Sequence, residues 1–272
     1  MEDAVLDGDA KKLAELLRQN PGFDVNGRQY KHEYYWNFLH SACGGRDSSS
    51  PVIPLLLAHP DIDVNSKDVF GQTPFFLACD GSTLCVREML KDSRVDVNEP
   101  DDDGRTPLRS AVSHIRLDII KWWIASGRDM DLGTPGDNQT DAIGVAKSAE
   151  PWYTEDMKRG KKEIVTLLER FKSDAAKTRH MVRLEIGWYN EAAAQIFALM
   201  VFVSDELLQI KDTTPSPIAR FFSIAARLPL ELQMVVCHRV VGSPKEIIPS
   251  KESEVAFKSL AERLQWPSLL TN

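Results

Sequence analysis

The sequence contains only four cysteines, at positions 43, 79, 85 and 237, and no two of them form a Cys-x-x-Cys pair. Such pairs are the usual pattern of structural zinc sites and of thioredoxin-like redox sites, so neither site is expected. The N-terminus, Met1-Glu2-Asp3, is acidic and no apolar core of a signal peptide follows it, which predicts an intracellular, cytoplasmic location. In that reducing setting the thiols are expected to be small buried core residues.

The sequence also lacks a long hydrophobic run. The most apolar stretch, 192–203, is interrupted by Gln195 and flanked by polar residues. A membrane span needs about 20 apolar residues, so this stretch predicts a buried helix and no membrane partner. A surplus of basic residues is absent as well, since the net charge is -7, which argues against a nucleic-acid partner.

Sequence motifs of catalysis are missing too. There is no G-x-S-x-G, no P-loop, no G-x-G-x-x-G and no H-E-x-x-H, and the six histidines are scattered. The run 101–103 is Asp-Asp-Asp, but it lacks the spacing of an EF-hand, so a solvated turn is favoured over a cation site. The sequence therefore predicts no enzyme, no cofactor and no metal.

What the sequence does contain is a repeat. An Asp-Val-Asn phrase stands at 24–26, 63–65 and 96–98, with a degenerate copy at 129–131; the last three copies are 33 residues apart and the first interval is 39. A second phrase follows each copy after 10 to 13 residues, at 37–42, 73–78, 106–111 and 140–142. Self-similarity at a fixed period indicates a repeat architecture.

A third feature keeps the same phase. Apolar residues recur at i, i+3 and i+4, which is one face of a helix. They are Ile53, Leu56 and Leu57; Val86, Met89 and Leu90; Ile119, Trp122 and Trp123; and Ile164, Leu167 and Leu168, with Ala14 and Leu17 in the first unit. Each unit thus predicts a turn, a short helix, a loop and an amphipathic helix, which can bury its apolar face only against stacked neighbours.

In these three features together the sequence resembles the ankyrin repeat, over roughly residues 4–171. The resemblance implies an all-α fold: an ankyrin-repeat solenoid of helix-turn-helix units with hairpin tips in residues 1–173, namely an N-terminal cap and about four further units. A C-terminal helical module follows in residues 174–272. The last unit departs from the pattern, since 140–142 lacks the proline and an insertion at about 150–160 is expected to separate its helices.

The repeat phrases have a physical explanation. Thr73 and Thr106 can cap the first helix of their units, and the following proline suits its first turn. Gly71 and Gly104 permit the positive φ of a hairpin tip. The aspartates at 68 and 101 can accept hydrogen bonds from the turn backbone. His40 stands at the histidine position of the phrase, so a structural hydrogen bond is favoured over catalysis.

In the C-terminal module the period stops. A central buried helix is expected at 191–210, followed by three helices with apolar faces. These faces are Ile218, Phe221, Phe222 and Ala225; Leu232, Val235 and Val236; and Ala256, Phe257, Leu260 and Leu264. The module is expected to shield the open end of the solenoid.

One part of the module, 228–266, also loosely resembles an F-box, because Leu-Pro-Leu-Glu-Leu at 228–232 opens a helix and a tryptophan closes the segment. That resemblance implies docking on a ubiquitin-ligase adaptor. The breakers at 242–250 interrupt the expected second helix, and a proline at a helix start is common without any such role.

The resemblance to ankyrin repeats implies that another protein is bound on the hairpin tips and the concave face. The tip residues that the fold does not fix are Tyr30, Tyr34, Tyr35, Trp36, Lys67, Val69, Phe70, Gln72, Asp102, Asp103 and Arg105. Aromatic side chains are typical of binding hot spots, although those of the first tip can instead pack locally beneath it. The sequence thus predicts a non-catalytic scaffold for protein–protein interaction, with a substrate-recruiting F-box-like subunit of a ubiquitin ligase as the alternative.

A short basic run at 158–162 leaves two interpretations open. It is expected to be a solvated helix start, and the alternative is a nuclear-import signal.

Overall fold

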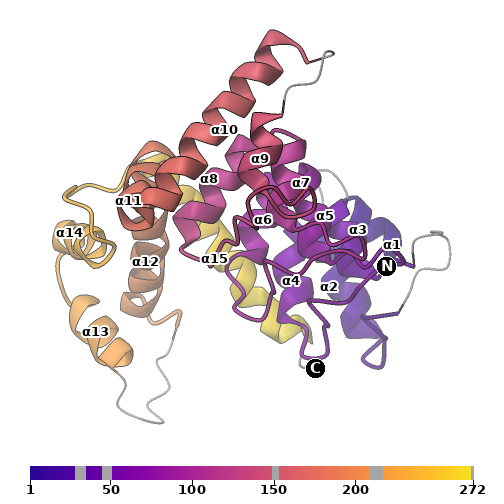
Figure 1. Ribbon diagram of the computed structural model, residues 1–272. Helices are drawn as coiled ribbons and strands as arrows, with labels where there is room; N and C mark the ends of the chain where they lie inside the picture. The colour runs from indigo at the N-terminus through magenta and orange to yellow at the C-terminus, as the bar shows by residue number, and fades with distance from the viewer. Residues whose placement is uncertain (28–34, 45–50, 149–152, 209–216, 271–272) are drawn as a thin grey trace. The chain divides into compact units, whose positions relative to one another are not determined.

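The computed structural model describes residues 1–27, 35–44, 51–148, 153–208 and 217–270, the last nine of these by their backbone only. The regular secondary structure in these ranges is helical throughout, which confirms the predicted all-α class (Figure 1). The chain divides into two compact units, a repeat unit at Met1–Val182 and a second unit at Arg183–Ser268. The predicted boundary after residue 173 coincides with the end of one helix, whereas the units meet nine residues later, inside the next helix.

The repeat unit is built from helix pairs. In chain order these are α1 (Glu2–Leu6) and α2 (Ala10–Gln19), α3 (Phe38–Gly44) and α4 (Ile53–Ala58), α5 (Pro74–Gly81) and α6 (Thr83–Met89), α7 (Pro107–Ser113) and α8 (Leu117–Ser126), and α9 (Ala142–Lys147) and α10 (Glu155–Ser173). A further helix, α11 (Ala175–Glu185), begins in this unit.

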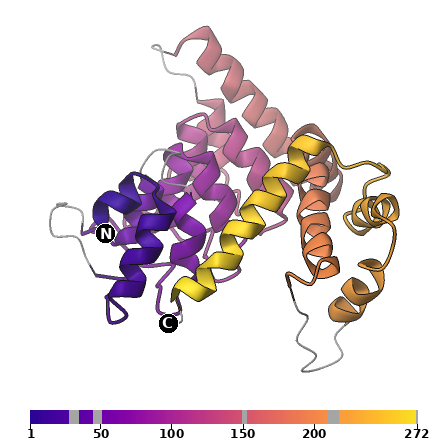
Figure 2. The same ribbon diagram turned by 180° about the vertical axis from the view of Figure 1, so that it is seen from behind.

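The pairs stack in two layers. Helices α1, α3, α5, α7 and α9 contact one another in sequence, and α4, α6, α8 and α10 do the same (Figure 1). Seen from behind, α1 and α2 (indigo) stand at one end of the row (Figure 2). Each pair buries its apolar side chains against its neighbours, as the 33-residue period predicts.

The predicted buried face of the second helices is largely confirmed. Fully buried side chains include Ile53 and Leu56, Val86 and Met89, Ile119 and Trp123, and Ile164 and Leu168. Three predicted positions, Leu57, Trp122 and Leu167, are only half-buried. In α4 the neighbouring Leu55 is fully buried.

The predicted caps are present. The Thr73 hydroxyl accepts a hydrogen bond from the Phe76 amide at 3.2 Å, and the Thr106 hydroxyl accepts one from the Arg109 amide at 3.3 Å. Pro74 and Pro107 occupy the first turn of α5 and α7. These contacts satisfy amides that a helix start leaves without backbone partners.

The predicted insertion at 150–160 is wrong in its second half. Residues 149–152 lie outside the described residues, but 155–160 form the first turns of α10, capped by the Thr154 hydroxyl. The basic run is therefore a helix start, as expected, but not a fully solvated one. Lys161 is buried and donates to the Val145 carbonyl at 3.0 Å and to the Tyr153 hydroxyl at 2.9 Å.

Helix α11 continues the repeat unit beyond its last pair. The Arg179 side chain donates to the Ile124 carbonyl of α8 at 3.2 Å. Thr178 and Val182 on the same helix are buried. Helix α11 is thus tied back onto the repeats, which explains why the unit extends past residue 173.

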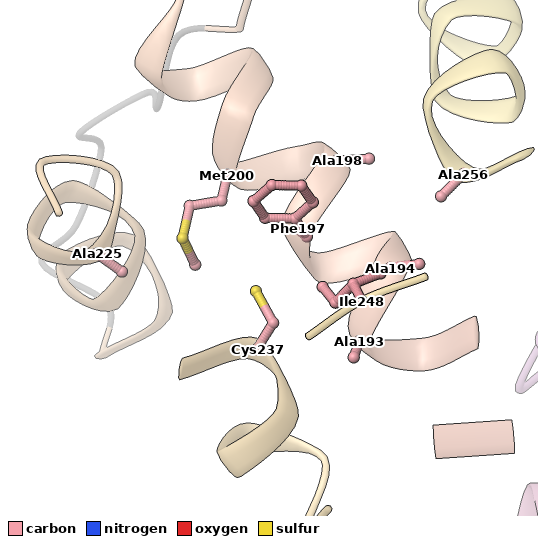
Figure 3. Packing of buried hydrophobic residues seen from close by; sticks show 9 residues of the cluster. All are labelled: Ala193, Ala194, Phe197, Ala198, Met200, Ala225, Cys237, Ile248 and Ala256. Carbon is pink, nitrogen blue, oxygen red and sulfur yellow. The ribbon is translucent and has the colours of Figure 1, made fainter. Parts of the chain in front are cut away.

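The second unit consists of α12 (Trp188–Ser204), α13 (Pro217–Ala225), α14 (Leu230–Val240) and α15 (Ser250–Leu270). Its core gathers around α12, where Phe197 and Met200 point toward Cys237 of α14 (Figure 3). Phe257 of α15 contacts the rings of Phe197 and Phe202, with centroid distances of 5.9 and 6.1 Å. The expected central helix is thus present, and several of its buried residues are alanines.

The predicted faces of the last helices are partly wrong. Ile218 is 70% exposed and Leu232 is 50% exposed, and α14 instead buries Gln233 and Cys237. The Gln233 amide nitrogen donates to the carbonyls of Ala226 and Leu228, so a polar residue outside the predicted apolar face is buried. Leu264 lies outside the described side chains. The expectation that residues 174–272 shield the solenoid stays a prediction.

All four cysteines lie in the described ranges, and each is a buried thiol rather than half of a disulfide. Burial raises the pKa of Cys43 and Cys79, and it raises the pKa of Cys237 to about 12. Their predicted role as core residues is confirmed.

Among the described residues, no single helix is long and apolar enough to cross a membrane. The consecutive helices α11 and α12 meet that length and composition criterion together, but the pair is sharply bent at the break between them. Much of α12 is buried in the core of the second unit.

Candidate functional site

The second hairpin tip, residues 67–72, is held by one buried aspartate. The Asp68 amide donates to the Gln72 carbonyl at 3.0 Å and closes the hairpin. The Asp68 carboxylate then accepts hydrogen bonds from the Phe70 and Gln72 amides, both at 2.9 Å. Gly71 supplies the positive φ of 72° that the turn requires.

The third tip, residues 99–105, repeats this construction. The Asp101 carboxylate accepts from the amides of Asp103 and Arg105 at 3.1 and 2.8 Å, and Gly104 has a φ of 78°. The Arg105 guanidinium lies 2.7 Å from Asp101 and 3.0 Å from Asp103. The hydrogen bond to Asp101 raises the pKa of Arg105. The predicted roles of both aspartates and both glycines in the turns are confirmed.

The two tips are joined to each other. The Asp102 amide donates to the Phe70 carbonyl at 3.0 Å. Lys67 pairs with Glu99 at 2.6 Å across the tips, and this contact raises the pKa of Lys67. A side chain at Gly71 would collide with the Asp102 carboxylate, so the glycine also permits the close approach. The second and third tips therefore form one continuous surface.

A role that the sequence analysis missed belongs to the asparagines of the Asp-Val-Asn phrase. The side-chain oxygens of Asn26 and Asn65 accept from the amides of Asp63 and Asp96, both at 2.8 Å, and that of Asn98 accepts from Asp131 at 3.1 Å. Each asparagine thus bridges its unit to the next. The 33-residue recurrence could have predicted this role. Stacked repeats place each Asp-Val-Asn phrase beside the same phrase of the next unit, so the asparagine side chain can reach the backbone there.

The first tip is described only in part. Tyr30 and Tyr34 lie outside the described residues. Tyr35 is 43% exposed, with a positive φ of 54°. Trp36 is half-buried, its ring lies against Gly44, and its indole nitrogen donates to the Asp68 carboxylate at 3.2 Å. Trp36 thus links the first tip to the second, and Tyr35 is the more accessible of the two.

His40 stands beneath these tips and is buried. Its Nε2 lies 3.1 Å from the Gln72 carbonyl, and its Nδ1 lies 2.7 Å from the Asn37 side-chain oxygen. Burial lowers the pKa of His40, which favours the neutral ring. The predicted structural hydrogen bond is therefore present, and it joins the helix of one unit to the tip of the next.

Among the remaining predicted tip residues, Val69 and Phe70 are exposed by 43% and 49%. Asp102 and Asp103 are also exposed, whereas Gln72 is half-buried and its backbone is engaged on both sides. We define the tip surface as Tyr35 together with residues 67–72 and 99–105. It combines large apolar side chains with charged ones on a backbone that its own hydrogen bonds hold in place.

A polar cluster on α5 and α7 brings together a serine, an aspartate and a histidine. The Ser110 hydroxyl donates to the Asp80 carboxylate, and His114 Nδ1 lies 3.5 Å from the same carboxylate. His114 Nδ1 also lies 3.1 Å from the Ser110 carbonyl. Because the Ser110 hydroxyl is directed at the carboxylate and not at the imidazole, the cluster does not form a serine–base pair.

Residues 39–133 match the family model described as "Ankyrin repeats (3 copies)". This segment is an array of ankyrin repeats. Ankyrin repeats are a protein–protein interaction module, and residues 67–72 and 99–105 of the tip surface lie within this segment.

Curated proteins similar to the chain include the human SMC5-SMC6 complex localization factor protein 1, 33% identical over 151 residues, which are 55% of this chain and 14% of that protein. The zebrafish Protein fem-1 homolog C is 33% identical over 119 residues, 44% of this chain and 17% of that protein. The spider alpha-latrocrustotoxin-Lt1a is 28% identical over 95 residues, 35% of this chain and 7% of that protein. The aligned part thus spans about a sixth or less of each of these relatives.

Proposed function

We propose that the chain is a non-catalytic scaffold and that the ankyrin tip surface binds another protein. The observation that carries this proposal is the adjacent pair Val69 and Phe70, exposed by 43% and 49% at the end of a hairpin. Exposed apolar side chains on a rigid backbone are favourable for binding, because little conformational freedom is lost when a partner covers them.

The relatives support a binding role in general terms. The name of the human relative describes a factor that localises a protein complex, and localisation is a consequence of binding. We propose the corresponding role here, attachment of one protein to another, without a reaction at the tip surface. A nuclear location, which the basic run at 158–162 leaves open, is proposed as the alternative to a cytoplasmic one.

The proposal is tested with a partner recovered by affinity capture on the intact chain, then purified and titrated by calorimetry. The double variant Val69→Ala/Phe70→Ala should weaken binding by about tenfold or more, as for a hot spot. Leu84→Ala is the matched control, because Leu84 is 40% exposed but lies on α6, away from the tips. Equal affinities of the double variant and the wild type, at equal melting temperatures, would contradict the proposal.

The adaptor-docking hypothesis for residues 228–266 is the second candidate. Leu230 and Leu232 at the start of α14 are 54% and 50% exposed, as docking leucines would have to be. Residues 241–249 are not helical, in line with the breakers noted in the sequence. Capture of a ubiquitin-ligase adaptor by the wild type, and its loss with Leu230→Asp/Leu232→Asp, would support this candidate; recovery of no ligase subunit with either form would contradict it.

A further inference from the structure

The tip surface carries an unequal set of charges. Residues 67–72 and 99–105 contain five acidic and two basic side chains. Both basic side chains are already engaged, Lys67 with Glu99 at 2.6 Å and Arg105 with Asp101 and Asp103 at 2.7 and 3.0 Å. The surplus is negative, and charge of one sign on a binding surface selects a partner of the other sign.

The surplus negative charge of the tip surface lies in part on the Asp102 carboxylate. Asp102 is exposed and makes no direct ion pair with another described residue, although its charge lies near enough to Lys67 to help raise the pKa of that lysine, which is paired with Glu99. Its amide donates to the Phe70 carbonyl at 3.0 Å, and its carboxylate lies beside Gly71, where a side chain would collide with it. A carboxylate without an ion pair and a half-exposed aromatic side chain therefore stand on adjoining turns of two repeats.

A carboxylate and an aromatic ring on adjoining turns favour a cationic ligand. A cationic side chain is attracted both by a carboxylate and by the face of an aromatic ring. Arginine suits such a place best, because its planar guanidinium stacks on rings and forms two parallel hydrogen bonds to a carboxylate. The exposed Val69 beside Phe70 adds an apolar contact for a neighbouring side chain of the same ligand.

We infer that the tip surface binds a basic segment of its partner, in which lysine or arginine stands beside an apolar residue. The inference rests on the proposed function and names the chemistry of the partner. In this arrangement a cationic side chain of the partner lies between Phe70 and Asp102, and the apolar residue covers Val69.

Two other occupants fit the surface less well. A metal ion would have to share the site with the Arg105 guanidinium, and no group of three or more potential metal ligands is found within the described ranges. A nucleic acid would be repelled by the negative surplus, because its binding depends on neutralising phosphates with basic side chains.

The test is a displayed library of random twelve-residue peptides, selected on the intact chain and counter-selected on Phe70→Ala/Asp102→Lys. The enriched peptides should carry a net positive charge, with lysine or arginine beside an aliphatic or aromatic residue. A synthetic peptide of the enriched sequence should lose about tenfold or more in affinity on Asp102→Lys, and about fivefold on Phe70→Ala. Added salt should weaken it, as for an exposed charge contact.

Matched controls separate a local effect from a general one. Glu163→Lys makes the same charge reversal on the exposed side of α10, and Leu84→Ala removes an exposed apolar side chain from α6. Both should change the affinity by less than about twofold, since surface changes outside a contact have small effects. Asp102→Asn, which keeps the shape of the side chain, should reproduce most of the loss and excludes misfolding as its cause.

The outcomes are distinguishable. Enriched peptides that depend on Phe70 but are neutral or acidic would overturn the basic-segment inference and leave the proposed binding surface in place. Failure to enrich any peptide that depends on Phe70 or Asp102 would overturn both. A loss on Glu163→Lys as large as that on Asp102→Lys would overturn the inference, because net charge alone would then explain binding.

Discussion

The two units bury their side chains in different ways. In the repeat unit, polar side chains fix the backbone at defined points: the buried Asp68 and Asp101 hold the tips, and the partly buried Asn65 bridges one unit to the next. In the second unit the core of α12 is rich in alanine, and large apolar side chains such as Ile218, Ile247 and Val255 remain 70%, 72% and 64% exposed. The repeat unit therefore uses polar contacts that recur from one repeat to the next, whereas the buried polar contacts of the second unit, such as those of Gln233, do not recur and stand beside a core rich in alanine.

The largest effect that sharpens this comparison is expected at Trp123. This residue is fully buried, contacts the Phe75 ring at a centroid distance of 5.1 Å and donates to the Asp129 carbonyl. Trp123→Ala should lower the free energy of unfolding by about 3 to 5 kcal/mol, since it leaves a large cavity. Trp122→Ala is the control, because Trp122 is half-buried beneath the Arg87 guanidinium, and a loss of less than about 1.5 kcal/mol is expected. Urea unfolding followed by circular dichroism measures both, and equal losses would contradict the assigned core.

The next effect concerns the turn aspartates. Asp68→Ala removes the acceptor of the Phe70 and Gln72 amides and of the Trp36 indole, so a loss of about 2 to 3 kcal/mol is expected. Asp68→Asn retains one side-chain oxygen and should recover part of this loss. The same unfolding experiment applies, and a neutral Asp68→Ala would show that the polar contacts do not specify the repeat.

The boundary between the units can be tested by truncation. A fragment of residues 1–182 keeps the buried Val182 and Thr178 and the Arg179 hydrogen bond to Ile124, which a fragment of residues 1–173 loses. Fragment 1–182 should be more stable by about 2 kcal/mol, and fragment 1–173 should associate more readily through the uncovered surface. Calorimetry measures the stability of the two fragments, and light scattering measures their self-association. Equal stability of both fragments would place the boundary at residue 173 instead.

The sequence predicts contacts between residues close in the chain better than contacts made by the packed fold. The caps at Thr73 and Thr106 and the turns at Asp68 and Asp101 could be predicted by residue, because each depends on neighbours within a few positions. The contact of Trp36 with Asp68 and the burial of Lys161 could not be predicted, because both depend on how the chain packs. The first joins residues 32 positions apart, and the Lys161 hydrogen bond to Val145 spans 16 positions. In the second unit even the buried face of α14 was mispredicted, because the hydrogen bonds of Gln233 outweigh the apolar pattern.

A smaller effect is expected from pH, through His40. Because burial lowers the pKa of His40 in the folded state, the unfolded chain takes up the proton first. The stability of the repeat unit should therefore be greatest above the ordinary histidine value of 6.5 and should fall as the pH drops through it. Unfolding between pH 5 and pH 8 tests this, and His40→Gln should show a flatter dependence. An equally steep dependence in that variant would assign the effect to another group.

The smallest effect belongs to the exposed apolar side chains of the second unit. Ile247→Ser should change the free energy of unfolding by less than about 0.5 kcal/mol, since Ile247 is 72% exposed. A clear loss of stability would show that this side chain is covered in the intact chain, and it would remove the contrast between the units.

The central claim, that the tip surface holds the partner, is tested most directly by hydrogen exchange of the intact chain with and without saturating purified partner. The account predicts slower exchange at residues 67–72 and 99–105, with little change in α6 and α8. Protection confined to those second helices, or to the second unit at Arg183–Ser268, would contradict it.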